Sequence, residues 1–241
     1  MSAPDHAMIL AAGLGTRMRP LTENCPKPLL PVAGRAMIDH ALDHATGAGV
    51  SRVVVNLHYL GEKIRIHLAG RQLPRIAFSD EQPEILETGG GIVHALPLLG
   101  ENPFYCINSD SIWVGPNPLG VLRESWKPAA MDALLLLVAR ERAHAYTRPG
   151  DFFLDREGGI PRRRADARTA PYIFSGAQIL KPQVFADAPS GAFSINLIWD
   201  RLIGAGRLAA VIYPGDWVDV GTPEGLTVAD ACLARSGKTG Q

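Results

Sequence analysis

The sequence predicts an α/β protein with a mostly parallel central sheet and helices on both faces. Short apolar runs alternate with helical patterns over the first 139 residues. Several of these runs are continuous and β-branched, as in strands that are buried on both faces. Hydrophobic residues make up 46% of the 241 residues, which is enough for a large core. Alternating strands and helices of this kind favour a parallel sheet with right-handed crossovers.

The first half contains most of the regular elements. Apolar runs predict strands at Ala7–Ala12, Arg52–Leu57, Arg75–Ser79, Phe104–Asn108 and Ala133–Ala139. Apolar residues at helical spacing predict helices at Ala36–Ala48, Tyr59–Ala69, Gly90–Leu99 and Leu119–Trp126. Gly49 follows the first of these helices and is a typical stop signal. The predicted order is therefore five strands with a helix between each pair of successive strands, and Arg75–Ser79 has the weakest strand pattern.

The pattern changes after about residue 140. The predicted strands become irregular, at Phe152–Leu154, Tyr172–Leu180 and Leu208–Tyr213, and helices are expected at Ile195–Ala205 and Thr222–Ala234. No stretch rich in Ser, Gly or Pro separates the two parts. The sequence therefore predicts a single domain over residues 1–241, with an N-terminal half at 1–140 and a less regular half at 141–235.

Composition excludes several classes of partner. Lysines and arginines number 24 and so do the acidic residues, so the net charge gives no footprint for nucleic acid or an anionic membrane. The three cysteines are far apart and form no zinc or disulfide pattern. No window approaches the ~20 apolar residues of a membrane span, and the N-terminal residues do not resemble a signal peptide. We expect a cytoplasmic protein without an obligate protein partner.

A glycine-rich turn follows the first predicted strand and suits a phosphate group. Ligands of a parallel sheet bind at the carboxyl ends of its strands. Gly13 and Gly15 let backbone amides converge on an anion, and the planar fork of Arg17 adds donors. Lys27 stands between two prolines that stiffen the chain around its charge. The alternative is a plain strand-ending turn with solvated cations.

Two familiar nucleotide motifs do not fit this turn. The third glycine of a dinucleotide fingerprint would fall at Met18, and no acidic residue closes the strand Arg52–Leu57. A phosphate-binding P-loop needs a Gly-Lys-Ser/Thr triplet, which is missing here. A dehydrogenase and a P-loop protein are therefore excluded.

A longer pattern resembles a known family. The segments AAGLGTRMRPLT and PKPL, with ETGGG, NSD, FSG and WVDVGT further along the chain, are similar to those of the sugar-1-phosphate nucleotidyltransferases. These enzymes join a nucleoside triphosphate to a sugar 1-phosphate and release pyrophosphate. The resemblance spans nearly the whole chain and implies a Rossmann-like fold with a smaller, sugar-binding subregion in the second half.

Two aspartates are candidate metal ligands. Asp110 follows the strand Phe104–Asn108, and Asp219 follows the strand Leu208–Tyr213. Mg²⁺ prefers one or two carboxylates together with phosphate oxygens and water. The resemblance implies that Asp110 and Asp219 hold a catalytic Mg²⁺. Either could alone be a turn-capping residue, and Asp216 is a competing carboxylate nearby.

The resemblance also implies roles for other residues. Arg17 and the backbone of the glycine-rich turn would hold the β- and γ-phosphates, and Lys27 would stabilise the α-phosphate. The residues implied to bind the nucleotide are Ala11, Ala12, Gly13, Leu14, Gly15, Thr16, Thr88, Gly89 and Gly90. Those implied to bind the sugar phosphate are Asn108, Gly150, Asp151, Ser175 and Gly176.

The base and the sugar are less clearly encoded. The ETGGG run is most similar to small bacterial members of the family that join UTP to N-acetylmuramate 1-phosphate in cell-wall recycling. The runner-up is a mannose-1-phosphate guanylyltransferase, and a catalytically silent sugar-nucleotide sensor is a third possibility. Four arginines, Arg162, Arg163, Arg164 and Arg168, could face the lactyl carboxylate of a muramate, although the sequence favours a solvated hairpin there.

Overall fold

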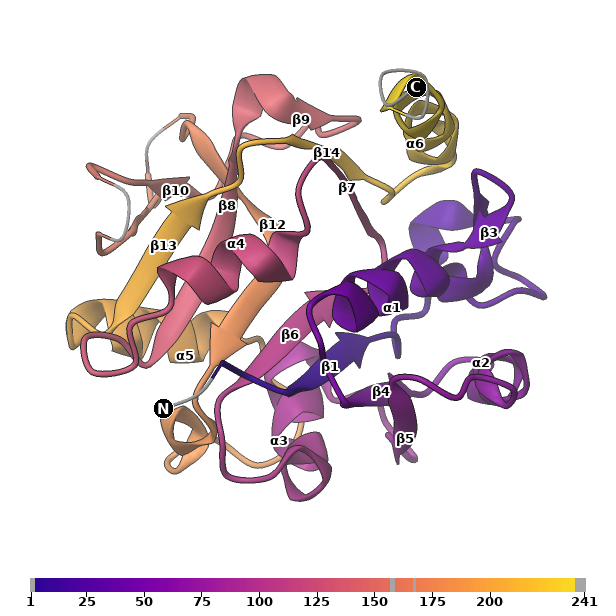
Figure 1. Ribbon diagram of the computed structural model, residues 1–241, viewed down its shortest axis with the longest axis horizontal. Helices are drawn as coiled ribbons and strands as arrows, with labels where there is room; N and C mark the ends of the chain where they lie inside the picture. The colour runs from indigo at the N-terminus through magenta and orange to yellow at the C-terminus, as the bar shows by residue number, and fades with distance from the viewer. Residues whose placement is uncertain (1–2, 157–158, 167, 237–241) are drawn as a thin grey trace.

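The central feature of the fold is a nine-stranded sheet (Figure 1). The computed structural model describes residues 3–156, 159–166 and 168–236. The strands of this sheet are β1 (His6–Leu10), β4 (Arg52–Leu57), β5 (Arg75–Asp80), β6 (Phe104–Asn108), β8 (Ala133–Ala139), β10 (Phe152–Phe153), β11 (Arg162–Arg163), β12 (Tyr172–Leu180) and β13 (Leu208–Ile212).

The sheet is mostly parallel, as the sequence predicts, but one strand runs the other way. Strand β1 pairs in parallel with β4 and β6, and β4 pairs in parallel with β5. Strand β12 lies between β6 and β8 and is antiparallel to both, while β13 is parallel to β8. Strands β8 and β13 therefore run in the same direction as β1, and all of these carboxyl ends lie at one edge of the sheet.

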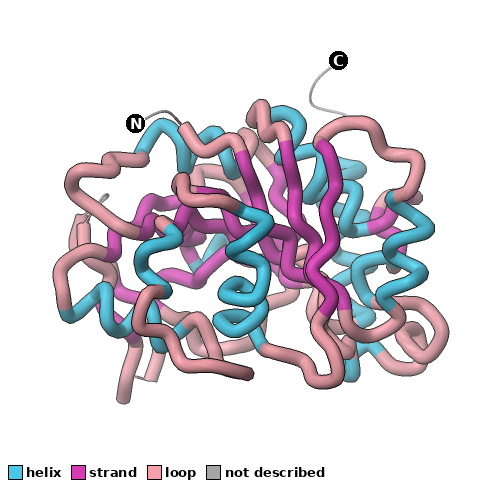
Figure 2. Tube along the Cα trace, turned by 90° about the horizontal axis from the view of Figure 1, so that it is seen from below, coloured by secondary structure: helices cyan, strands magenta, loops and turns pink. Residues whose placement is uncertain are grey.

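Helices cover both faces (Figures 1 and 2). Alternate side chains of each strand point to opposite faces, so Ala7 and Ile9 of β1 join one core and Met8 joins the other. The first core includes α1 (Met37–Gly47), α2 (Gly61–Leu68) and α4 (Pro118–Ser125). The second includes α3 (Glu87–Leu99) and α5 (Asn196–Gly204). The sheet is thus buried on both sides, which explains its continuous apolar runs.

A second, three-stranded sheet stands beside the carboxyl edge. It contains β7 (Ser111–Val114), β14 (Asp216–Asp219) and β9 (Ala143–His144), in the order β7-β14-β9. Helix α6 (Pro223–Ser236) packs on this sheet through a third apolar cluster. The sequence does not predict these short strands, because each has at most four residues. A two-stranded ribbon of β2 (Pro31–Val32) and β3 (Arg35–Ala36) was also not expected.

The second sheet determines where Asp219 lies. The sequence predicts Asp219 after the strand Leu208–Tyr213, at the carboxyl edge of the sheet. That strand ends at Ile212, and Asp219 instead ends β14, where it pairs with Ser111 of β7. The antiparallel pairing of β7 and β14 therefore carries Asp219 back to Asp110, the residue before β7.

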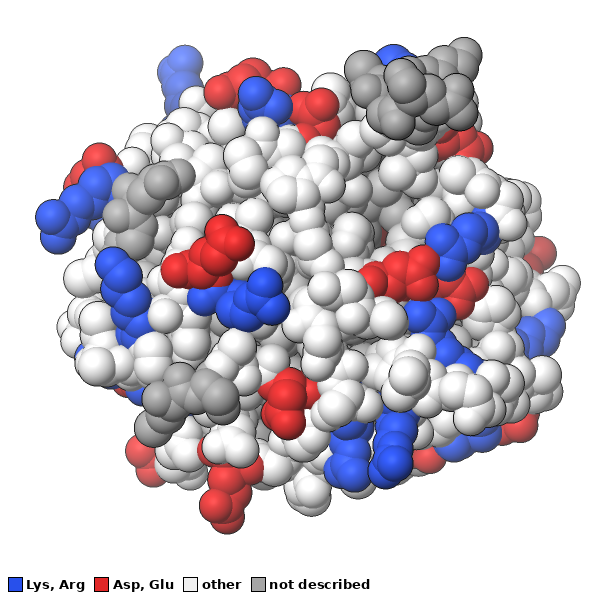
Figure 3. Space-filling view, in the orientation of Figure 1, with Lys and Arg blue, Asp and Glu red and all other residues white. Residues whose placement is uncertain are grey.

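The predicted helices and strands are present, with ends shifted by at most three residues. Helix α3 begins at Glu87 rather than Gly90, so it includes the whole ETGGG run. Among the described residues, no helix has the length and apolar character needed to cross a membrane. On the face shown in Figure 3, positive and negative side chains are interspersed, in keeping with the balanced composition.

Candidate active site

The site begins where two neighbouring parallel strands end. Leu10, the last residue of β1, is paired with Asn108, the last residue of β6. Just beyond, the Ser109 hydroxyl donates a hydrogen bond of 2.7 Å to the Leu10 carbonyl and ties the two loops together. The chain continues from β1 toward β4 on one side, while β6 lies on the other. This reversal of strand order is where parallel sheets bind their ligands.

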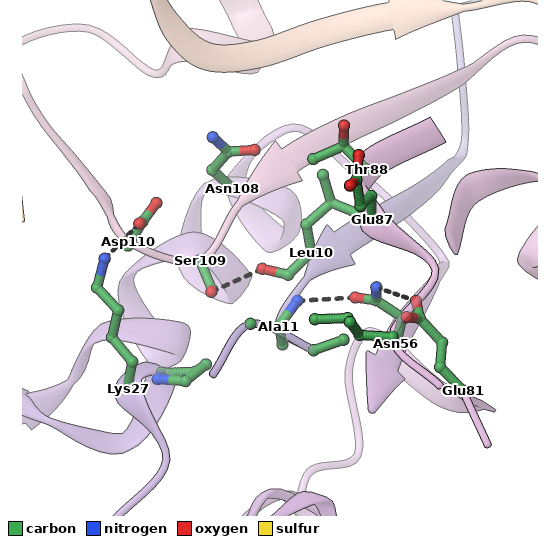
Figure 4. Close-up of a pocket in the computed structure, with 14 residues that line it drawn as sticks. Leu10, Ala11, Lys27, Asn56, Glu81, Glu87, Thr88, Asn108, Ser109 and Asp110 are labelled. Carbon is green, nitrogen blue, oxygen red and sulfur yellow. Dashed lines mark hydrogen bonds and ion pairs between the residues drawn. The ribbon is translucent and has the colours of Figure 1, made fainter. Parts of the chain in front are cut away.

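A pocket of about 210 Å³ opens at this point, and we call it the first pocket (Figure 4). Its walls come from the ends of β1, β4 and β6, from the start of α3 and from the turn around Lys27. Its lining residues are Leu10, Ala11, Ala12, Gly13, Lys27, Pro28, Asn56, Glu81, Ile85, Glu87, Thr88, Asn108, Ser109 and Asp110. All belong to the N-terminal half that the sequence predicts to bind the nucleotide.

A buried polar chain forms one wall of the first pocket (Figure 4). The Ala11 amide donates to Asn56 Oδ1 at 2.7 Å, and Asn56 Nδ2 donates to Glu81 Oε1 at 2.6 Å. The other carboxylate oxygen of Glu81 accepts from the Leu86 amide at 2.8 Å. Asn56 and Glu81 are 3% and 1% exposed, so this chain fixes the start of the glycine turn relative to α3.

The glycine turn is held by the residues that follow it. Gly15 has φ +63, and the Thr22 hydroxyl donates to its carbonyl at 2.8 Å. A Cβ at Gly15 would stand only 3.0 Å from Thr22 and 3.2 Å from Lys27, so only glycine fits this conformation and this space. Within the described residues, the amides of Gly13 and Leu14 find no protein acceptor. The turn therefore presents free donors, as an anion-binding loop requires.

The predicted metal ligands and the predicted catalytic lysine meet in one cluster. Lys27 Nζ lies 2.5 Å from Asp110 Oδ2, and its side chain is only 11% exposed. Arg148 lies 3.4 Å from the Asp219 carboxylate, while Arg17 lies against Gly221 close to Asp219. Burial, together with the negative charge of Asp110, raises the pKa of Asp219. The carboxylates of Asp110 and Asp219 thus lie near each other in a partly buried place. Two such carboxylates can bind a divalent cation together with phosphate oxygens.

No larger ligand cluster accompanies this pair. In residues 3–156, 159–166 and 168–236, no group of three or more His, Cys, Asp or Glu side chains could hold a metal ion. Asp216, the competing carboxylate, points to Arg142 and His144 and does not line either pocket of the site. A metal at Asp110 and Asp219 would therefore need substrate or water oxygens to complete its coordination.

A second pocket of about 320 Å³ adjoins the first and shares Leu10, Thr88, Asn108 and Asp110 with it. Residues from both halves of the chain line this pocket. They include the predicted phosphate ligand Arg17 and the predicted metal ligands Asp110 and Asp219, but not Lys27. Its remaining lining residues are Arg17, Ser111, Arg148, Asp151, Phe152, Arg163, Phe174, Gln178, Ser194, Ile195, Asn196, Trp199, Trp217 and Asp219. The two pockets therefore meet at Asp110, between the glycine turn and Asp219.

Several predicted site residues lie behind the pocket walls instead of on them. The Ser175 hydroxyl donates to the Leu136 carbonyl and is fully buried. Gly176, with φ +88, lies at a bulge of β12 where a Cβ would stand 2.5 Å from Ser111 Oγ. Gly150, with φ +85, packs on the Ala170 carbonyl. These residues shape the second pocket without lining it, whereas Asp151 does line it.

The glycines of the ETGGG run also have a packing role. The amides of Gly89 and Gly90 both donate to the Phe193 carbonyl. A Cβ on Gly89 would stand 2.3 Å from the Phe193 ring, and one on Gly90 would stand 2.3 Å from the Gly191 carbonyl. Only Thr88 of the predicted base-binding residues lines a pocket. The glycines thus let α3 approach the segment before α5.

Other residues of the site were not singled out from the sequence. Asn56 is the buried polar residue of the strand RVVVNL, and Glu81 follows the weak strand β5. A polar residue in a buried strand signals a hydrogen-bond partner, so this pattern could have identified Asn56. Arg148 in the second pocket carries no such signal, because its place depends on how the loops fold. Trp199 and Trp217, which could stack on a ligand but which the sequence favours as core residues, both line this pocket.

Comparisons with known proteins agree with this geometry. A MobA-like NTP transferase domain matches residues 7–175, which is more than half of the chain. The chain therefore belongs to the MobA-like NTP transferases, a family of nucleotidyltransferases.

Two bacterial relatives cover nearly the whole chain. It is 44% identical over 240 residues to an N-acetylmuramate alpha-1-phosphate uridylyltransferase of Caulobacter vibrioides, with 97% of this chain and 99% of that protein covered. It is 35% identical to a protein of the same name from Neisseria meningitidis, over 93% and 96% of the two chains. These relatives confirm the resemblance to sugar-1-phosphate nucleotidyltransferases.

More distant proteins share the fold. A mannose-1-phosphate guanylyltransferase catalytic subunit beta of Xenopus tropicalis is 29% identical, and the match covers 90% of this chain and 61% of that protein. The crystal structure of a putative glucose-1-phosphate thymidylyltransferase from Bacillus anthracis superposes with a TM-score of 0.78 at 21% identity, over 95% of each chain. This likeness confirms the predicted Rossmann-like fold class.

Proposed function

We propose that this protein transfers a uridylyl group from UTP to N-acetylmuramate 1-phosphate, giving UDP-N-acetylmuramate and pyrophosphate, with Mg²⁺ as its cofactor. The main support for the proposal is that two pockets meet at Asp110. The N-terminal half alone lines the first pocket, and both halves line the second. The 44% identity to the Caulobacter enzyme supports this choice of sugar and base. The proposal includes the single domain, the cytoplasmic location and the absence of an obligate partner expected from the sequence.

The first pocket is suited to the nucleotide. Its apolar lining residues Leu10, Pro28 and Ile85 would contact a flat base, and the free amides of the glycine turn suit the β- and γ-phosphates. Arg17 would neutralise the same phosphates from the far side of the turn, near Gly221. The triphosphate would then run from the first pocket toward the place where both pockets meet.

The proposed reaction needs alignment and charge neutralisation rather than a general base. A sugar-1-phosphate oxygen attacks the α-phosphorus of UTP, the new P–O bond forms, and the bond to pyrophosphate breaks in line. The attacking phosphate is already ionised near neutral pH, so no side chain has to remove a proton. Lys27 would leave Asp110 to hold the α-phosphate, and such a contact typically contributes about 3 kcal/mol to the barrier reduction.

Asp110 and Asp219 are the residues that would hold Mg²⁺. They fit that role because both are carboxylates, they approach each other, and the pKa of Asp219 is raised by burial and by Asp110. The bound ion would supply positive charge beside the phosphate oxygens. Asp151 would contribute to sugar binding, since the Phe174 amide donates to its carboxylate at 3.0 Å and holds it at the wall of the second pocket.

A pyrophosphate-release assay tests the proposal. UTP, GTP, CTP and dTTP would each be combined with N-acetylmuramate 1-phosphate, mannose 1-phosphate and glucose 1-phosphate, with Mg²⁺ and with EDTA. We expect turnover with UTP and the muramate, abolished by EDTA and restored by Mg²⁺. Turnover confined to GTP and mannose 1-phosphate would instead establish the guanylyltransferase. Nucleotide binding without turnover by any pair would indicate the silent sensor.

A further inference from the structure

Arg163 is the one arginine of the segment 162–168 that lines the second pocket. It lies on the short strand β11, where antiparallel pairing sets it opposite Phe152 of β10, another lining residue. Side chains alternate along a strand, so the neighbouring Arg162 belongs to the other face. Arg162 lies over the Phe153 ring and pairs with Asp155, and it does not line the pocket.

The guanidinium of Arg163 is held in a defined orientation. It lies 5.2 Å from the ring centroid of Phe152 and 5.5 Å from that of Trp199, and Nε donates to Asp200 Oδ1 at 2.8 Å. Asp200 is itself outside the pocket wall. Nη2 also donates to the Asn196 carbonyl at 3.4 Å. These contacts fix the plane of the guanidinium, so the N–H groups that they do not use are oriented in advance for a planar anion.

This arginine is separate from the cations near the metal ligands. Arg17 and Arg148 line the same pocket, and both lie close to Asp219. They and Lys27 are the cations that stand beside the proposed phosphate and metal site. Arg163 has none of these neighbours. Its own neighbours belong to β10 and α5 and are Phe152, Trp199, the Asn196 carbonyl and Asp200. Asp200 pairs with Arg163 from outside the pocket wall, so the arginine is the charged group of this pair that lines the pocket, where a neutral sugar would need none.

We propose that Arg163 binds a carboxylate carried by the sugar and thereby selects an acidic sugar 1-phosphate over a neutral one. The inference rests on the proposed function, because the lactyl group of N-acetylmuramate 1-phosphate is that carboxylate. N-Acetylglucosamine 1-phosphate is the matched neutral substrate, since it differs only in lacking the lactyl group. The geometry also narrows the four arginines considered from the sequence to one, as the Arg164 side chain donates to the Gly150 carbonyl and Arg168 does not line the pocket.

The test measures substrate choice. In the wild type and in Arg163→Met, Arg163→Lys and Arg162→Met, kcat/KM would be measured with UTP for both sugar phosphates. Methionine keeps much of the packing of the arginine stem on Phe152 and Trp199. We expect R163M to lower the preference for the muramate by about 10- to 100-fold, mainly through its KM, because a charge-assisted hydrogen-bonded pair is lost. R163K should lose less, and R162M should keep the preference within about twofold.

The outcomes separate this inference from the proposed function. If the wild type uses no muramate substrate, the proposed function fails and the inference fails with it. If the wild type prefers the muramate and R163M keeps that preference, the function stands and the inference is overturned. An equal loss on both sugars would also overturn it, because Arg163 would then act on the fold or on a group that both sugars share. Calorimetric binding of UDP-N-acetylmuramate and thermal melting of each variant would identify a folding defect.

Discussion

The two pockets of this protein hold their polar groups in different ways. In the first pocket, Ala11, Asn56 and Glu81 are almost completely buried and hydrogen-bond one another. In the second, Arg148 pairs with Asp219 and Arg163 pairs with Asp200, and both arginines are partly exposed. One wall is therefore a fixed part of the core, whereas the other consists of side chains held by surface contacts.

This difference separates stability from substrate choice. A buried polar group that loses its partner costs stability, because nothing replaces the lost hydrogen bond. Ion pairs between partly exposed side chains contribute little to stability, so their loss should leave the fold intact. Substitutions at the first pocket should thus affect both folding and nucleotide binding, while substitutions at the second should affect activity or specificity alone.

The largest effect is expected where the pockets meet. Asp110→Asn or Asp219→Asn should lower kcat/KM by about 10³-fold or more, because each removes one proposed ligand of Mg²⁺ and its charge. Pyrophosphate release measures this loss. Asp216→Asn is the matched control, since Asp216 is also on β14 but faces Arg142 and His144, and it should stay within about twofold of the wild type. A comparable loss of kcat/KM in D216N would contradict the choice of Asp110 and Asp219 as the metal ligands.

The next largest effect is a difference in kcat/KM between substitutions of two arginines in the glycine turn. Arg17 lines the second pocket close to Gly221, whereas Arg19 is exposed and lines neither pocket. Arg17→Ala should lower kcat/KM by about 10²-fold through lost phosphate contacts, and Arg19→Ala should change it by less than about threefold. Steady-state kinetics over a UTP series tests both. If the two substitutions lowered kcat/KM equally, the triphosphate would not bind beside Arg17 as proposed.

A smaller effect should sharpen the contrast between the pockets. Glu81→Gln leaves one acceptor oxygen for two donors, Asn56 Nδ2 and the Leu86 amide, so one hydrogen bond is lost. We expect the free energy of unfolding to fall by about 1–3 kcal/mol and the KM for UTP to rise about tenfold, with the KM for the sugar phosphate unchanged. Urea unfolding and kinetics measure these changes, and Glu84→Gln, an exposed change in the same loop, is the control. An unchanged stability would contradict the role of the buried chain.

The last effect concerns stability outside both pockets, where α1 packs against β7. His44 of α1 packs edge-on against Trp113 of β7 at 5.7 Å, and burial lowers its pKa to about 4. Between its ordinary pKa of 6.5 and about 4, the unfolded chain binds a proton that the folded chain does not. Stability should therefore fall on acidification through this window, by up to about 3 kcal/mol. Unfolding of the wild type and of His44→Phe at several pH values tests this, since the variant should lack that part of the pH dependence.

Much of the N-terminal half could be predicted from its sequence, because local patterns determine it. The strands RVVVNL and FYCIN, the glycine turn and the position of Lys27 all depend on residues within a few positions of one another. The first pocket lies at the ends of these strands, so the general rule for parallel sheets places it.

The second pocket depends on pairings between distant segments. Strand β12 enters the sheet between β6 and β8 in the antiparallel direction, which no local pattern specifies. Ser175 and Gly176 were expected at the sugar because their motif resembles one in the family, but a bulge in β12 turns Ser175 toward Leu136. Strand β14 likewise has four residues, and only its pairing with β7 brings Asp219 to Asp110.

The position of β12 has a consequence for how the chain is made. When residues 1–140 have left the ribosome, β6 and β8 both exist, yet the strand that joins them has not been synthesised. Each would present an unpaired edge until residue 180 emerges, and unpaired edges favour aggregation. The two halves are therefore not independent units of folding. A chain split near residue 140 should be rescued only when both fragments are produced together.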